Sequence, residues 1–281
     1  MRGWLAAGRV RVDGLVVRRA DAGVAADARV TLGAAAPAFP SALGLVHEDD
    51  DLLVVDKPPG LLTVATDRER ERTAYRLLTE YVAAQGRGAS PRTSRGRGAS
   101  RSRQARRAWD PDPAVRSEPL NRPRVFIVHR LDRETSGLLV FAKAAAVKRR
   151  LQAQFAARTV ERGYVAVVEG RVRDDAGTLH DRVAEDPTTL RVRTSRRGRE
   201  AITEYRVRER RPRTTVLELR LVTGRRGQIR AQLAALGHPI VGDRAFGAKT
   251  DPLRRVCLHA AVLGFTDTHG RPLHFTSPAR F

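Results

Sequence analysis

The stretch "VHRLDRETSGLLVFAK", residues 128–143, sets one acidic residue among cations. Asp132 lies between Arg130 and Arg133, three residues after His129, and a T-S-G turn follows it. The apolar run after the turn predicts a buried strand. An ordinary ion pair on the surface would not require a turn and a buried strand beside it. We therefore expect this stretch to hold a carboxylate at a fixed point on a strand edge.

Short β-rich segments surround this stretch. "YVAVVEG" (164–170), "AITEYRVRE" (201–209) and "TVLELRLV" (215–222) follow it along the chain, and the last alternates apolar with polar residues. A helix is predicted over 145–158 by apolar residues spaced by four. Many strands with few helices predict an α+β fold with a mostly antiparallel sheet, to which a small N-terminal unit is added.

A second helix is predicted by "GQIRAQLAALG", residues 227–237. Its spacing places Ile229, Leu233 and Leu236 on one inward face. Gly237 follows the last of these residues and is expected to end the helix, because glycine readily adopts the left-handed conformation of a helix C-cap.

The composition divides the chain into segments. Residues 1–35 contain two β-rich runs around an Asp13-Gly14 turn, which is typical of a hairpin. Residues 36–43 are expected to form a linker, and residues 44–281 the main domain. Residues 86–124 contain eleven Arg, three acidic residues and a repeated GRGAS, which predicts a flexible basic insertion, either an RNA-contacting arm or an inert loop.

The charge points to a polyanionic partner. The chain has 53 Lys and Arg against 31 Asp and Glu, a net charge of +22, of which +14 lies outside residues 86–124. Nucleic acid is the usual partner of such a protein, although genome composition can also favour Arg. The single cysteine, Cys257, excludes an intramolecular disulfide, and no apolar segment has the length of a signal or a membrane span. We expect a cytoplasmic protein.

Several kinds of site are absent from the sequence. It has no glycine-rich nucleotide loop, no G-x-S-x-G nucleophile motif, and no metal-ligand spacing among its seven His and one Cys. Any catalysis is therefore expected to use side chains alone, with no cofactor and no metal.

Four segments together resemble a known family. They are "VVDKPPGLLTV" (54–64), "VHRLDRETSGLLVFAK" (128–143), "ERGYVAVVEG" (161–170) and "TGRRGQIRAQLAALGHPIVGDRAFG" (223–247). In text and order they resemble the RluA family of RNA pseudouridine synthases, over about residues 44–281 apart from the insertion. Residues 1–35 resemble the C-terminal part of an S4 RNA-binding domain, most of whose preceding helices are missing.

The resemblance implies an isomerase that converts a uridine in RNA to pseudouridine. It implies that Asp132 is the catalytic aspartate and that Arg230 is its ion-pair partner. Cations beside Asp132 would keep it ionised where burial would otherwise neutralise it. Tyr164 is implied to stack on the flipped uracil, and its hydroxyl to take the proton from C5.

The resemblance assigns further residues with less detail. Leu258 would form an apolar wall of the pocket, and Arg130 and His129 would touch the phosphate backbone or fill the space of the displaced base. The chain departs from the family at Arg226-Gly227, where a Thr-His pair is usual. This departure leaves open how the segment before the second helix is positioned.

Two other functions remain open. A non-catalytic RNA-binding or ribosome-assembly protein would share the fold, and the Arg226-Gly227 departure is compatible with it. A glycosylase of free nucleosides is disfavoured by the net charge of +22. The sequence does not distinguish rRNA from tRNA as the substrate.

Overall fold

The computed structural model divides the chain into two compact units, Met1–Pro40 with Val64–Val125, and Ser41–Thr63 with Phe126–Phe281. The predicted boundaries at 35 and 43 remain predictions. Most of the predicted basic insertion, residues 88–123, lies outside the described residues. The structure describes residues 2–13, 15–17, 20, 23–33, 35, 37–66, 72–87, 124–186 and 192–281.

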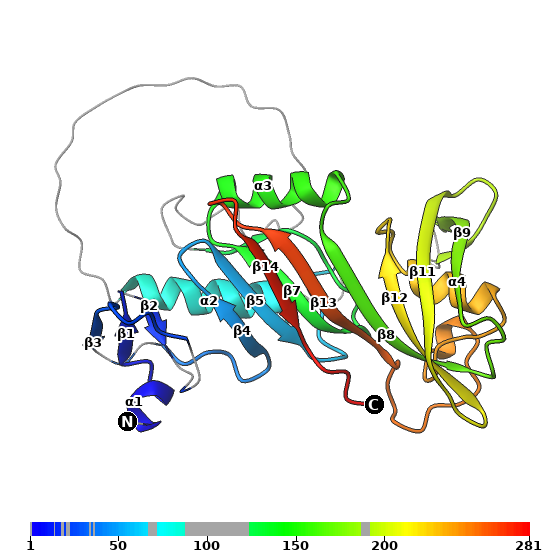
Figure 1. The fold of residues 1–281 in the computed structure, drawn as a ribbon, viewed down its shortest axis with the longest axis horizontal. Coiled ribbons are helices and arrows are strands. Elements are labelled where there is room, and N and C mark those ends of the chain that lie inside the picture. Colours follow the sequence, from blue (N-terminus) through cyan, green and yellow to red (C-terminus); the bar gives the residue numbers. More distant parts are fainter. Residues whose placement is uncertain are drawn as a thin grey trace, which may run out of the picture. The chain divides into compact units, whose positions relative to one another are not determined.

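The first unit contains a small antiparallel sheet with the strand order β2-β1-β3 (Figure 1). Asp13, with φ of 51°, links β1 to β2, which confirms the predicted hairpin. Its resemblance to an S4 domain remains a prediction. The elements are α1 (Arg2–Ala6), β1 (Val10–Val12), β2 (Leu15–Val17), β3 (Val30–Leu32) and α2 (Ala74–Arg87).

The second unit is built on an eleven-stranded sheet with the order β10-β9-β11-β12-β8-β13-β7-β5-β4, to which β14 and β6 are added at β13 and β7. Among the described strands only β7 and β13 pair in parallel, so the predicted α+β fold with a mostly antiparallel sheet is confirmed. The strands are β4 (Gly44–Glu48), β5 (Leu52–Lys57), β6 (Phe126–Ile127), β7 (Ser136–Ala142), β8 (Glu161–Glu169), β9 (Ala176–Glu185), β10 (Val192–Thr194), β11 (Arg199–Arg210), β12 (Thr214–Leu221), β13 (Leu258–Thr266) and β14 (Pro272–Thr276).

Strand β7 is the apolar run after the T-S-G turn, and it is buried along its whole length. It lies between β5 and β13. Gly137 has φ of +113°, and a Cβ there would lie 2.3 Å from the carbonyl oxygen of Ala260 on β13. Only glycine can adopt this conformation and allow so close an approach, so the turn residue also fixes the strand pairing.

Three short helical segments complete the second unit: α3 (Ala145–Ala156), α4 (Gln228–Ala235) and the 3₁₀ helix η2 (Arg244–Phe246). Ile229 and Leu233 of α4 are buried as predicted, and Gly237, with φ of +86°, follows the helix end. The prediction for Leu236 is wrong. The helix ends at Ala235, and the Leu236 side chain is 42% exposed at the C-cap. No described helix is long and apolar enough to cross a bilayer.

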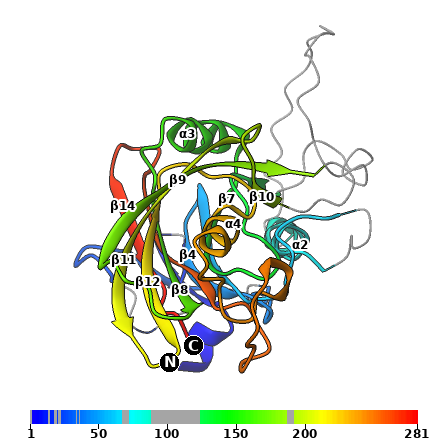
Figure 2. The same ribbon diagram turned by 90° about the vertical axis from the view of Figure 1, so that its right-hand side faces the viewer.

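The two largest of the described hydrophobic clusters pack against the sheet. One includes Leu217 of β12, Ala166 of β8 and Leu233 of α4, and the other includes Val140 of β7 and Leu151 of α3. Helix α3 accordingly lies beside β7 and β13, and α4 beside β9 and β10 (Figures 1 and 2). Strands β8 and β13 pair where the two halves of the sheet meet. The candidate active site opens at this junction.

Candidate active site

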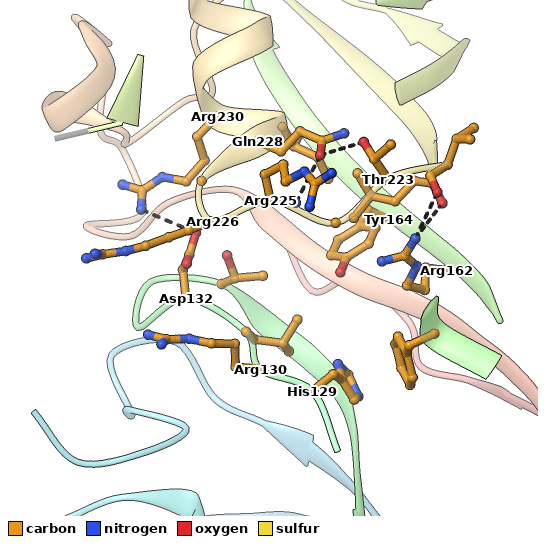
Figure 3. Close-up of a pocket in the computed structure, with 18 of the residues that line it drawn as sticks. His129, Arg130, Asp132, Arg162, Tyr164, Thr223, Arg225, Arg226, Gln228 and Arg230 are labelled. Carbon is orange, nitrogen blue, oxygen red and sulfur yellow. Dashed lines mark hydrogen bonds and ion pairs between the residues drawn. The ribbon is translucent and has the colours of Figure 1, made fainter. Parts of the chain in front are cut away.

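A cavity of about 500 Å³ lies between the two halves of the sheet. Its walls come from the loop before β7, the start of β8, the start of β13, and the segment that joins β12 to α4 (Figure 3). Segments far apart in the sequence thus meet here. All six site residues predicted from the sequence line this one cavity: His129, Arg130, Asp132, Tyr164, Arg230 and Leu258.

The loop that carries Asp132 is tied to the segment around β5. Thr63 Oγ1 donates a hydrogen bond to the carbonyl oxygen of Leu131 at 2.8 Å and accepts one from the Leu131 amide at 3.2 Å. Lys57 Nζ donates to the carbonyl oxygen of Arg133 at 3.2 Å. Fixed contacts on both sides of Asp132 therefore hold its backbone in place.

Arg230 is shared by three carboxylates. Its Nη1 lies 3.9 Å from Asp132 Oδ2 and 3.1 Å from Glu134 Oε2. Its Nε and Nη2 donate to the two carboxylate oxygens of Asp243 at 2.6 and 2.8 Å, a bidentate pair. The guanidinium also lies 4.7 Å from the centre of the Phe246 ring. The predicted Asp132–Arg230 ion pair is present, but it is the longest of the three.

Burial raises the pKa of Asp132, while Arg230, Arg130 and Arg226 oppose this rise. The net shift is upward. The expectation that neighbouring cations would reverse the effect of burial is therefore wrong for this structure. The physical reason is that Arg230 makes its closest contacts with Asp243 and leaves only a longer one to Asp132.

Tyr164 projects from β8 into the cavity, on a strand paired to β12 and β13. Burial raises its pKa to about 12, with Arg162 opposing the rise and Asp132 adding to it. Its hydroxyl therefore stays protonated at neutral pH. Leu258, the first residue of β13, is 3% exposed and supplies the predicted apolar wall.

His129 and Arg130 differ in charge. His129 Nε2 accepts a hydrogen bond from the Val140 amide at 3.2 Å, which places the ring proton on Nδ1. Its pKa is lowered to about 3 by burial and by Arg162, and its ring stacks on Phe155 at 4.7 Å. A neutral His129 cannot offer a cation to a phosphate. Arg130 is exposed and can.

The segment that leads into α4 contains the Arg226-Gly227 departure and also contributes Gln228, Thr223 and Arg225, which the sequence patterns did not single out. Gln228 Oε1 accepts hydrogen bonds from Thr223 Oγ1 at 2.8 Å and from the Arg225 amide at 3.0 Å, which fixes the turn. Gly227 opens the helix with φ of +59°, and a Cβ there would lie 3.3 Å from Val192. Arg226 pairs with Glu185 of β9.

The chemistry available to the cavity is that of a carboxylate, a phenol and several guanidinium groups. The described residues contain no cluster of three or more His, Cys, Asp and Glu that could hold a metal ion. A carboxylate at a rigid turn with a guanidinium nearby suits attack on, or proton removal from, a sugar. The aromatic ring of Tyr164 suits stacking on a base.

The sequence is similar to known RNA pseudouridine synthases. The profile of the family described as RNA pseudouridylate synthase matches residues 51–235. "Ribosomal large subunit pseudouridine synthase D" of Xylella fastidiosa is 32% identical over 282 residues, which cover 93% of this chain and 75% of that protein. The protein of the same name from Xanthomonas campestris is 34% identical over 298 residues, which cover 98% and 79%.

Solved structures share the fold. Human RNA Pseudouridylate Synthase Domain Containing 1 superposes with a TM-score of 0.59 at 22% identity, covering 84% of this chain and 83% of that chain. Human RNA Pseudouridylate Synthase Domain Containing 4 gives a TM-score of 0.60 at 20% identity, covering 84% and 88%. At these identities the likeness concerns the fold alone.

Proposed function

Because the chain belongs to the RluA family of RNA pseudouridine synthases, isomerases that act on RNA, we propose that it modifies uridines in ribosomal RNA and that Asp132 is its catalytic carboxylate. One observation carries the proposal for the site: Asp132, Tyr164 and Arg230, which are separated in the sequence, line the same cavity. The names of the bacterial relatives support ribosomal RNA as the substrate.

Asp132 acts on the ribose. The uridine leaves its stack and enters the cavity, at a cost of a few kcal/mol that favours loops and flexible sites in the RNA. The N1–C1′ bond breaks, the uracil turns, and C5 joins C1′. The carboxylate either bonds to C1′ or removes a proton from the sugar. Both routes need an ionised Asp132, which Arg230, Arg130 and Arg226 favour against the larger opposing effect of burial.

Tyr164 and Leu258 hold the base. The phenol ring stacks on the uracil and Leu258 packs against it. The proton on C5 must leave once the new bond forms. A phenol with a pKa of about 12 can accept this proton only as it passes its own proton on. Arg130 meets the phosphate backbone, and neutral His129 fills the space beside the displaced base. No step needs a cofactor.

The positions of pseudouridine in treated RNA show which class of RNA the protein modifies. The purified protein is incubated with transcripts of large-subunit rRNA and with a tRNA pool, and pseudouridines are located at single-nucleotide resolution. We expect new pseudouridine at defined positions in the rRNA and none in the tRNA. Modification of tRNA alone would contradict the proposed substrate. No modification of either RNA would favour a non-catalytic RNA-binding protein.

A further inference from the structure

Arg162 reaches into the cavity beside Tyr164, two residues before it on β8 (Figure 3). Its Nη2 donates hydrogen bonds to the carbonyl oxygens of Leu221 and Val222 at 3.1 and 3.2 Å. These two bonds hold the guanidinium at the end of β12. The sequence patterns assign it no role.

This cation lacks a counter-ion. Within the part of the chain that the structure describes, no carboxylate lies within ion-pair distance of Arg162, and its buried Nε has no hydrogen-bond acceptor. Its neighbours add no negative charge: the Phe155 ring lies 5.8 Å away, His129 is neutral, and Arg158 repels it. A partly buried, unpaired charge is costly, and such costs are typical of functional sites.

The chain makes room for this cation with a glycine. A Cβ on Gly224 would lie 2.4 Å from Arg162 Nη1. Since two carbonyl groups hold the guanidinium, it could not move aside without breaking hydrogen bonds. The glycine and the two carbonyl acceptors together form a built position for a cation that faces the cavity.

We propose that Arg162 stabilises the negative charge that develops on the uracil when it is detached from the ribose. This inference rests on the proposed function. When the N1–C1′ bond breaks, its electron pair leaves with the base and spreads over N1, O2 and O4. C1′ has then lost an electron pair, and Asp132 makes up for this loss by bonding to C1′ or by removing a proton from the sugar. The pair is used again when C5 bonds to C1′, and the C5 proton then leaves.

The position of Arg162 fits this role better than a contact to phosphate. Tyr164, which holds the base, lies next to it, and the adjoining wall is the aromatic pair Phe155 and His129. Electrostatic stabilisation by a fixed cation is strongest where water is excluded and the cation has no competing partner. Asp132 and Arg162 thus divide the work between sugar and base.

A substituted substrate tests the inference. Fluorine at C5 withdraws electron density, so a detached 5-fluorouracil anion needs less help from the protein. Single-turnover rates are measured at saturating RNA containing uridine or 5-fluorouridine at the target site, as the disappearance of the N1-linked nucleoside, because 5-fluorouridine has no proton at C5 to release. For Arg162→Gln we expect a loss of about 100-fold on uridine, the usual effect of removing one such donor. The loss on 5-fluorouridine should be smaller by roughly fivefold or more.

Two further variants keep the test decisive. Arg162→Lys should remain within about tenfold of the wild type on uridine, since it keeps the charge but not the planar fork. Gly224→Ala leaves Arg162 in the chain but displaces its guanidinium. It should therefore show the same unequal losses as Arg162→Gln, and it replaces that variant if circular dichroism shows that Arg162→Gln is unfolded.

The matched control is Arg158→Gln, which removes a neighbouring arginine of the same cavity that pairs with Glu200. Its losses should be equal on both substrates. Equal losses on both substrates for Arg162→Gln and Gly224→Ala, with an active wild type, would overturn this inference and leave the proposed function intact. A wild-type protein inactive on uridine would instead overturn the proposed function.

Discussion

Arg230 contacts three carboxylates unequally, and this inequality sets the state of Asp132. The bidentate bond to Asp243 fixes the guanidinium, and the longer contact at 3.9 Å leaves Asp132 able to move toward a substrate. An ion pair held tightly to Arg230 would make the carboxylate a weaker nucleophile and base. The geometry therefore favours an Asp132 that feels the positive charge of Arg230 without being tied to it in a close ion pair.

The Tyr164→Phe variant separates stacking from proton transfer. The ring remains, so RNA affinity should stay within about twofold of the wild type, because phosphate contacts dominate affinity. The hydroxyl is absent, so the single-turnover release of tritium from C5 should slow by about 100-fold, the usual effect of a general base. A wild-type rate together with weaker RNA binding would show that Tyr164 only stacks on the base.

The sequence itself points only to Asp132, because an acidic residue lies there among arginines at a turn before an apolar run. The roles of Tyr164 and Arg230 are implied by the resemblance to the RluA family. Arg162 and Asp243 could not be found in this way. Their importance depends on contacts that form only in the fold. Among the described residues Arg162 has no counter-ion near its guanidinium, and Asp243 binds Arg230.

Strand β5 ends in a buried lysine that organises the catalytic loop. Lys57 is 0% exposed, and its ammonium donates to the carbonyl oxygens of Pro58, Leu61 and Arg133 at 3.0, 2.8 and 3.2 Å. Burial lowers its pKa to about 8, against the opposing effect of Glu134 and Asp132. A single side chain thus joins the end of β5 to the loop before β7.

The Lys57→Met variant should reveal this titration in the stability of the protein. The unfolded chain binds the proton with a pKa near 10.5 and the folded chain with one of about 8, so the unfolded state holds more protons between these values. The unfolding free energy of the wild type, relative to Lys57→Met, should therefore rise by about 2 kcal/mol between about pH 8 and pH 10.

Urea denaturation at several pH values measures this difference. Lys249→Met, a change at an exposed lysine, serves as the control for removal of a lysine that is not buried. A wild-type stability that falls relative to Lys57→Met as pH rises would contradict a lowered pKa for Lys57 and would imply that its charged form is the favoured one in the fold.

Most helices and strands could be predicted from the sequence, but the pairing of strands and the contacts between elements could not. Alternation marked β12, and the spacing of apolar residues marked α3, because both signals are local. The parallel pairing of β7 with β13 and the left-handed Gly227 depend on contacts with distant residues. Leu236 was misplaced because spacing alone does not tell where a helix ends.

Exposed arginines gather where β10 ends and β11 begins. The turn between β10 and β11, together with the strand residues next to it, carries four exposed arginines with no acidic partner among the described residues: Arg193 on β10, Arg196 and Arg197 in the turn, and Arg199 on β11. Strand β10 packs against α4 at the cavity, where Val192 meets Gly227. We expect this turn to contact the RNA that flanks the target uridine.

Neutralising this turn should change the salt dependence of binding. With all four arginines changed to Gln, the slope of log affinity against log salt should fall by about 0.7 for each single-strand phosphate that the variant no longer binds. The single-turnover rate at saturating RNA should stay near that of the wild type, since these side chains lie outside the cavity. Filter binding of an rRNA fragment at several salt concentrations measures the slope.

Four other exposed arginines provide the control: Arg206 near the far end of β11, Arg171 and Arg173 between β8 and β9, and Arg213 between β11 and β12. Changing these four arginines to Gln removes the same charge as changing the four at the turn. The slope of log affinity against log salt should nevertheless stay larger in this control variant than in the turn variant. Equal slopes for the two variants would mean that only the total charge matters. At this scale the composition predicted the polyanionic partner, but only the fold shows which arginines flank the cavity.

If Asp132 performs the chemistry, the Asp132→Asn variant should be inactive on RNA that carries tritium at C5 of uridine. Asn keeps the shape of the side chain and removes its charge, while Arg230 keeps Asp243 and Glu134 as partners. We expect folding and RNA affinity near those of the wild type and no tritium release above that of RNA alone. Glu134→Gln, which also removes a carboxylate from Arg230, should still release tritium. Release by Asp132→Asn at the wild-type rate would contradict the assignment.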